Sequence, residues 1–153
     1  MEKLVSWKKG FFSSTYQFYS NGIQIGFLKI GVWVNKANGV LNDKGFEFKT
    51  KGFFKQETII TDTKMNIVVG TITYNAWKSK ALIKLTDGTE CNWAYTNFWC
   101  TKWSLSKNLY FINYQGLNTK GDIVSYLSDD LLIISGLFIS NHFWQSRAAV
   151  AAT

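Results

Sequence analysis

The last quarter of the chain holds the feature that most constrains the fold, a segment from Leu131 to Trp144 that is apolar on nearly every face of a helix. A surface helix carries one apolar stripe, because successive residues are turned by about 100°. A helix that is apolar all round must be surrounded by other elements. The apolar positions that cover the whole circumference are Leu131, Leu132, Ile133, Ile134, Leu137, Phe138, Ile139, Phe143 and Trp144.

The start of this helix is marked by three polar residues. Ser128 is expected to cap the first turn by accepting a hydrogen bond from a free N–H, and Asp129 and Asp130 lie where the helix dipole favours carboxylates. The sequence therefore predicts a helix over about 128–146. Its apolar part is too short for a bilayer span, which needs about 20 mostly apolar residues, so we expect it inside the protein.

The rest of the chain predicts β-structure. Short segments rich in aromatic and β-branched residues alternate between apolar and polar positions, as half-buried strands do. Turn signals separate them, among them Asn21-Gly22, Asn38-Gly39, Lys51-Gly52 and Asp87-Gly88. The predicted strands are Leu4–Trp7, Tyr16–Tyr19, Gly22–Lys29, Val32–Val34, Phe46–Lys49, Phe53–Thr61, Ile67–Tyr74, Ala81–Leu85, Glu90–Thr96, Lys102–Ser106, Leu109–Tyr114 and Asp122–Tyr126.

Strand number and helix together predict the architecture. An open sheet of a dozen strands would leave two long edges free to pair with other chains, whereas closure removes both. A barrel of eleven or more strands is wide enough to hold a helix. We therefore expect a mainly β single domain over residues 1–153, a closed antiparallel barrel of about 12 strands (residues 4–126) around a central hydrophobic C-terminal helix.

An internal similarity recurs at an offset of 44 residues. It is compatible with a duplicated hairpin unit and also with chance likeness between two β-rich segments. Gly26 and Gly70, each inside a predicted strand, are expected to mark bulges. The matched pairs are Ile23 and Ile67, Ile25 and Val69, Gly26 and Gly70, Leu28 and Ile72, Trp33 and Trp77, and Asp43 and Asp87.

Charge and composition narrow the function classes. The net charge is +7, but Arg147 is the one arginine, and nucleic-acid readers favour the planar arginine fork. No nucleic-acid partner is therefore predicted. The N-terminus lacks the apolar core of a secretory signal, and Cys91 and Cys100 are read as reduced thiols. These features predict a cytoplasmic protein, with a peripheral position at the inner membrane face as one option.

The search for catalytic motifs is negative. His142 is the single histidine and falls within the predicted core helix, where a polar residue near the barrel mouth is a better interpretation than a general base. Asp129 and Asp130 fit a helix start better than a paired-carboxylate active site. We predict no enzyme activity, no catalytic residues, no metal site and no cofactor.

Two groups of surface residues are the candidate binding site. Lysines around one turn, and lysines beside a tryptophan around another, would attract an anionic lipid headgroup while the indole enters the membrane interface. Solvated lysines on outward strand faces are the alternative interpretation. The candidate headgroup-binding residues are Lys49, Lys51, Lys55, Trp77, Lys78 and Lys80.

Three segments give the chain a resemblance to a known family. They are Ile60–Ile72, Lys102–Leu105 and Asp130–Leu137, taken in that order with about twelve strands before a terminal apolar helix. The pattern resembles the tubby C-terminal domain superfamily, which includes LURP-one-related proteins and phospholipid scramblases. The resemblance implies a barrel around a central helix and contact with membrane lipids, and it carries over no individual site residue.

Two functional hypotheses follow. The first is a non-enzymatic cytosolic binding domain that contacts anionic membrane phospholipid, or a protein partner, through its outer face. The alternative is an intracellular carrier of a hydrophobic ligand inside the barrel, in the manner of lipocalins or fatty-acid-binding proteins. The two compete for the same interior volume, so the position of residues 131–144 discriminates between them.

Overall fold

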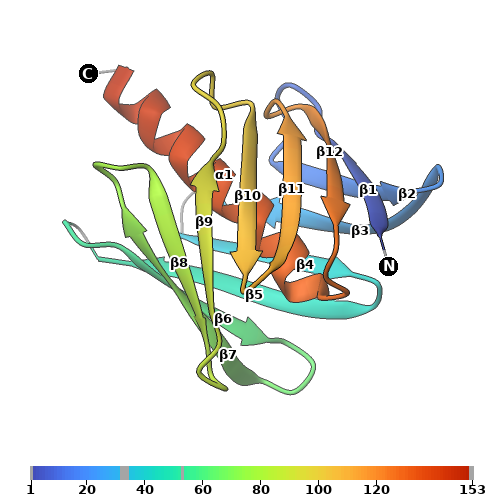
Figure 1. Cartoon of the computed structure of the whole chain (residues 1–153), viewed down its shortest axis with the longest axis horizontal. Helices are drawn as coiled ribbons and strands as arrows, with labels where there is room; N and C mark the ends of the chain where they lie inside the picture. The colour runs from blue at the N-terminus through green and yellow to red at the C-terminus, as the bar shows by residue number, and fades with distance from the viewer. Residues whose placement is uncertain (1, 32–34, 53, 152–153) are drawn as a thin grey trace.

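The fold is a closed antiparallel barrel threaded by a helix, seen in a computed structural model that describes residues 2–31, 35–52 and 54–151. Figure 1 shows the strands wrapped around α1 (Asp130–Ala151), whose C-terminal end leaves the barrel on the side opposite the N-terminus of the chain. The predicted fold class is confirmed. The strands within the described residues are β1 (Lys3–Lys8), β2 (Thr15–Ser20), β3 (Ile23–Ile30), β4 (Lys36–Leu41), β5 (Lys44–Lys51), β6 (Glu57–Asp62), β7 (Ile67–Asn75), β8 (Lys80–Leu85), β9 (Glu90–Tyr95), β10 (Lys102–Lys107), β11 (Tyr110–Gly116) and β12 (Lys120–Ser125).

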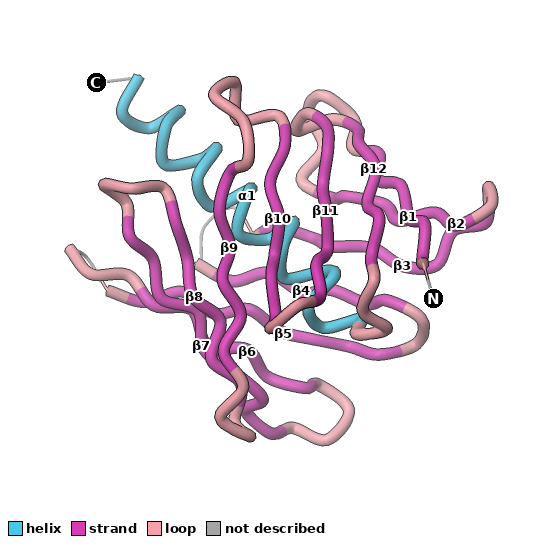
Figure 2. Tube along the Cα trace, viewed as in Figure 1, coloured by secondary structure: helices cyan, strands magenta, loops and turns pink. Residues whose placement is uncertain are grey.

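Each strand pairs with its neighbours in sequence, and β1 pairs with β12 to close the barrel. Because every pair is antiparallel, alternate connections lie at the same end. The helix-entry rim is formed by the turns 21–22, 42–43, 63–66, 86–89 and 108–109 and by residues 126–129. The helix-exit rim is formed by the loops 9–14, 31–35, 52–56, 76–79, 96–101 and 117–119. Figure 2 shows both sets of loops.

β4 corrects the sequence interpretation. Asn38-Gly39 was predicted to be a turn, but both residues lie inside this strand. A Cβ on residue 39 would overlap the side chain of Ile134, so the central helix, and not a turn, requires glycine here. The predicted strand Val32–Val34 lies outside the described residues.

The boundary of β6 differs as well. The strand predicted over Phe53–Thr61 begins only at Glu57, and Phe54 and Lys55 lie in the preceding loop. Gly52, with a φ of 100°, turns the chain there, and a Cβ on it would overlap the Lys55 carbonyl. The β-forming residues of this segment are therefore displaced from the ladder by the turn.

The glycines of the internal similarity do mark bulges. Phe18 pairs with Gly26 but Tyr19 pairs with Gln24, which leaves one extra residue in β3. In the same way Ile60 pairs with Gly70 and Thr61 with Val68. The predicted bulges at Gly26 and Gly70 are confirmed. The two segments occupy equivalent positions, since β3–β4 and β7–β8 have the same bounds 44 residues apart.

The middle of α1 is enclosed on all sides. Every residue from Leu132 to Asn141 is buried, so the barrel interior is filled by the side chains of its own C-terminal helix. The cap is Asp129 and not Ser128, because the Asp129 carboxylate accepts a hydrogen bond from the Leu132 amide at 3.2 Å. Within a short polar run, sequence alone does not decide which residue is the cap.

Three aromatic donors from neighbouring strands hold the helix in register. The indole N–H groups of Trp93 and Trp103 both donate to the Gly136 carbonyl, at 3.0 and 3.2 Å, and the Tyr114 hydroxyl donates to the Ile133 carbonyl at 2.7 Å. The Tyr114 ring lies against Gly136 so closely that a Cβ there would overlap its hydroxyl. Gly136 is thus a site of close approach.

We expect Gly136→Ala to destabilise the protein although alanine is the better helix former. Overpacking costs about 1–3 kcal/mol and each weakened hydrogen bond about 1 kcal/mol, against about 1 kcal/mol gained in helix propensity. The net loss should be about 2 kcal/mol, measured by urea denaturation. Ser146→Ala, at an exposed position of the same helix, is the control, and equal stability of the two variants would contradict the close approach.

Candidate functional site

The six residues predicted to bind a headgroup lie together at the helix-exit rim. Lys49 and Lys51 lie in the exit half of β5, Lys55 in the following loop, Trp77 and Lys78 in the β7–β8 loop, and Lys80 at the start of β8. All six are exposed. Since β5–β6 and β7–β8 are adjacent hairpins of the barrel, the fold joins two lysine groups that lie far apart in sequence.

The same rim carries exposed aromatic rings that sequence reasoning missed. Among the described residues, every phenylalanine or tryptophan more than three-quarters exposed lies in an exit-rim loop. The signal that could have found them is the occurrence of aromatic residues within turns, where no alternation gives them a buried face. They are Phe11 (80%), Phe12 (96%), Phe54 (98%), Trp77 (95%), Phe98 (87%) and Trp99 (79%).

Local hydrogen bonds give these loops defined shapes. In the 96–101 loop the Asn97 carboxamide oxygen accepts hydrogen bonds from the amides of Thr101 and Lys102, both at 3.0 Å. In the 76–79 loop Asn75 accepts one from the Lys78 amide at 3.1 Å. The aromatic tips are therefore presented by ordered turns, although burying them elsewhere in the protein would be favourable.

Two of the loops carry aromatic pairs. The rings of Phe11 and Phe12 meet edge to face with centroids 4.9 Å apart, and those of Phe98 and Trp99 with centroids 5.4 Å apart. Edge-to-face packing is a favourable arrangement of such rings. Each pair thus forms a small apolar tip that stays exposed to solvent.

Exposed apolar residues at the helix-entry rim are of a different kind. They are mostly aliphatic, such as Ile23 (69%), Met65 (68%) and Leu109 (90%). The exposed rings on that side, including Tyr110 at 56%, are less accessible than those of the exit rim. The two rims therefore differ in aromatic content more than in total apolar exposure.

Charge is also distributed unequally between the two ends. Of the 17 basic residues, twelve lie in the exit half, and of the 10 acidic residues, seven lie in the entry half. The exit half is therefore strongly positive and the entry half slightly negative. The basic residues of the exit half are Lys8, Lys9, Lys29, Lys36, Lys49, Lys51, Lys55, Lys78, Lys80, Lys102, Lys120 and Arg147.

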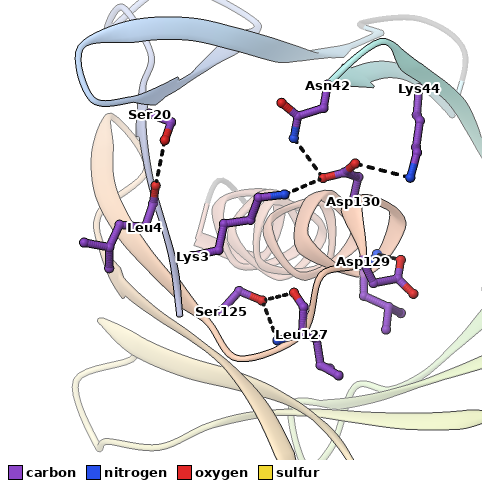
Figure 3. Close-up of polar contacts among 10 residues, drawn as sticks. Lys3, Leu4, Ser20, Asn42, Lys44, Ser125, Leu127, Asp129 and Asp130 are labelled. Atoms are coloured by element: carbon purple, nitrogen blue, oxygen red, sulfur yellow. Dashed lines mark hydrogen bonds and ion pairs between the residues drawn. The ribbon is translucent and has the colours of Figure 1, made fainter. Parts of the chain in front are cut away.

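Acidic residues at the entry rim hold the helix in place. The Asp130 carboxylate is buried and lies 3.4 Å from the Lys3 ammonium and 3.5 Å from that of Lys44, and it accepts a hydrogen bond from Asn42 at 3.0 Å. Figure 3 shows these three side chains converging on Asp130 from β1, β5 and the turn before β5. The two carboxylates that could have suggested catalysis are thus the cap and the anchor of α1.

Grooves open at the exit rim beside the emerging helix. One of about 610 Å³ lies between α1 and the loops 52–56 and 76–79. Another of about 440 Å³, with more polar walls, lies on the side of α1 that faces the 9–14 loop. There the Tyr16 hydroxyl is hydrogen-bonded to Asn118 and accepts a hydrogen bond from Asn141 at 2.9 Å. Both grooves are open to solvent, unlike the filled interior that an internal ligand would have to enter.

His142 lies at the exit mouth of the barrel. Its ring stacks on that of Tyr74 with centroids 3.9 Å apart, and burial lowers the pKa of the imidazole to about 4. At neutral pH it is an uncharged aromatic wall. Within the described residues, no cluster of three or more histidine, cysteine or acidic side chains is arranged to hold a metal ion.

The lowered pKa of His142 predicts that acid weakens the fold. The unfolded chain takes up a proton near the ordinary value of 6.5 and the folded chain only near 4, so stability falls as the pH decreases through that window. Between about pH 7 and about pH 5 the loss should be about 2 kcal/mol at most. Urea denaturation at the two pH values measures it. His142→Gln should remove most of the change, and an unaltered slope in that variant would contradict the assignment.

No helix in the described part of the chain is long and apolar enough to cross a bilayer. The fold and the rim thus define a closed twelve-stranded barrel with a basic, aromatic end. No protein-family model, curated protein or solved structure matches the chain. Kinship with the tubby superfamily accordingly remains a prediction from the order of strands and helix.

Proposed function

We propose that this protein is a non-enzymatic domain that docks on anionic phospholipid membranes through its helix-exit rim. The observation that carries the proposal is the coincidence of fully exposed aromatic rings and most of the basic residues at one end of the barrel. A basic end alone would favour solubility, and aromatic tips alone would favour protein contacts. Together they match the two layers of a membrane interface, anionic phosphates and an apolar boundary.

Attraction and insertion have separate roles in this mechanism. Lysines near an anionic surface each contribute about 1 kcal/mol, and they act over about 10 Å at moderate salt. This brings the exit rim, and not the acidic entry rim, to the bilayer. The Phe and Trp side chains at the loop tips then enter the interface, where aromatic rings are favoured. We expect the docking to occur at the cytoplasmic face of a membrane.

Co-sedimentation with vesicles tests the proposal. The protein should bind vesicles that contain phosphatidylserine at least about tenfold more tightly than vesicles of phosphatidylcholine alone, and high salt should weaken the binding. Negligible binding to both vesicle types would overturn the proposal. Equal binding to both would overturn the role of the basic residues.

A further inference from the structure

The groove of about 610 Å³ at the exit rim joins an apolar wall to two cationic side chains. Tyr74, His142 and Phe143 line it from β7 and α1, and Lys55 and Arg147 line it from the 52–56 loop and from the end of the helix. Its volume lies in the range of pockets that enclose small organic ligands, about 300–1,000 Å³. None of its described lining residues is acidic.

The wall is apolar because its polar atoms are already engaged or uncharged. The Tyr74 hydroxyl is hydrogen-bonded to the Thr58 hydroxyl at 2.6 Å. The Tyr74 ring meets Phe143 edge to face, with centroids 6.0 Å apart, and stacks on His142. A hydrocarbon chain could lie along these rings without displacing a hydrogen bond.

The two cations come from different elements, so an anion between them would bridge helix and loop. Arg147 is the chain's one arginine, and its guanidinium lies 5.1 Å from the centroid of the Tyr95 ring. Stacking of this kind orients a guanidinium, whose planar donors match carboxylate and phosphate oxygens. Lys55 is exposed and available as a second positive charge.

We propose that this groove binds one single-chain anionic amphiphile, with its alkyl chain along Tyr74 and Phe143 and its carboxylate or phosphate between Lys55 and Arg147. The inference deepens the proposed membrane docking, since the groove opens at the same rim. The ligand would be a fatty acid or lysophospholipid taken from the bilayer, or the same molecule free in solution. Binding of a soluble monomer and binding to vesicles separate these two sources.

Calorimetry with monomeric amphiphiles tests the groove without a membrane. Dodecanoate and dodecyl phosphate, kept below their micelle concentrations, should bind at least about tenfold more tightly than dodecanol, because only they carry a charge for the two cations. Dodecyltrimethylammonium should bind weakly. Equal affinity for the anion and the alcohol would overturn the charged end of the site, and no binding of any of them would overturn the groove.

Matched variants locate the site. Lys55→Gln and Arg147→Gln should each weaken dodecanoate binding about tenfold, whereas Lys78→Gln removes the same charge from the neighbouring loop, outside the groove lining, and should leave it unchanged. Ser146→Phe should fill the groove and abolish binding. Ser146 is exposed and bonds only to the His142 carbonyl one turn earlier, so we expect that variant to fold, which circular dichroism would verify.

The groove and the docking proposal can fail separately. If Ser146→Phe loses dodecanoate but still binds phosphatidylserine vesicles, the site is the groove and docking is independent of it. If the intact protein binds vesicles but not dodecanoate, the groove proposal is wrong and docking stands. If it binds dodecanoate but not vesicles, the groove proposal stands and docking is wrong. Equal effects of Lys78→Gln and Lys55→Gln on dodecanoate would place the ligand elsewhere.

Discussion

A chain that ends at Leu127 should lose its cooperative fold. The deletion removes the buried run from Leu132 to Asn141 and with it the filling of the barrel. Each large apolar side chain of that run contributes about 1.5–3 kcal/mol by burial, and their sum is of the same size as the whole stability of a domain, about 5–15 kcal/mol. Trp93, Trp103 and Tyr114 would also lose the helix carbonyls that they bond.

Near-UV circular dichroism and urea denaturation measure this loss. The truncated chain should lack a sigmoidal unfolding transition and the near-UV signal of ordered aromatic rings. A deletion that begins at Ala149 removes only residues beyond the exposed end of the helix and is the control, which should unfold cooperatively like the intact chain. A stable, cooperatively unfolding barrel without residues 128–153 would contradict the central role of the helix.

The second large effect concerns the aromatic tips. The triple variant Phe12→Ser, Trp77→Ser and Trp99→Ser should bind phosphatidylserine vesicles about 100-fold more weakly than the intact chain, because each ring that enters the interface contributes about 1 kcal/mol. Folding should be unaffected, since the three side chains are 96%, 95% and 79% exposed. Vesicle co-sedimentation gives the affinities, and thermal unfolding verifies the fold.

The opposite rim offers a matched control. Ile23→Ser, Met65→Ser and Leu109→Ser remove three comparably exposed apolar side chains from the helix-entry rim. This variant should keep the affinity of the intact chain, because the entry half is the acidic half. An equal loss in both triple variants would show that docking is not confined to the exit rim.

Much of the architecture was predictable because burial leaves a periodic trace. Strands with one buried face alternate in sequence, and a surrounded helix is apolar on all faces. Predictions failed where one long-range contact decided the local structure. Asn38-Gly39 has the residues of a tight turn, yet Gly39 lies in a strand beside Ile134. A propensity gives no sign of a partner 95 residues away.

The candidate site was predictable only in part. The lysines and Trp77 were found as two local groups, but their gathering at one rim depends on the closure of the barrel. Phe12 and Trp99 were missed, because an aromatic residue suggests burial until the surrounding loop is known to lie outside.

The sequence by itself determined that this chain is a barrel around its own C-terminal helix, since the apolar periodicities permit few other ways to bury those residues. Only the tertiary structure decided which surface is presented to a partner. An antiparallel barrel sends alternate loops to the same end, so residues spaced along the whole chain meet at one rim. That gathering is a property of closure, and local sequence carries no record of it.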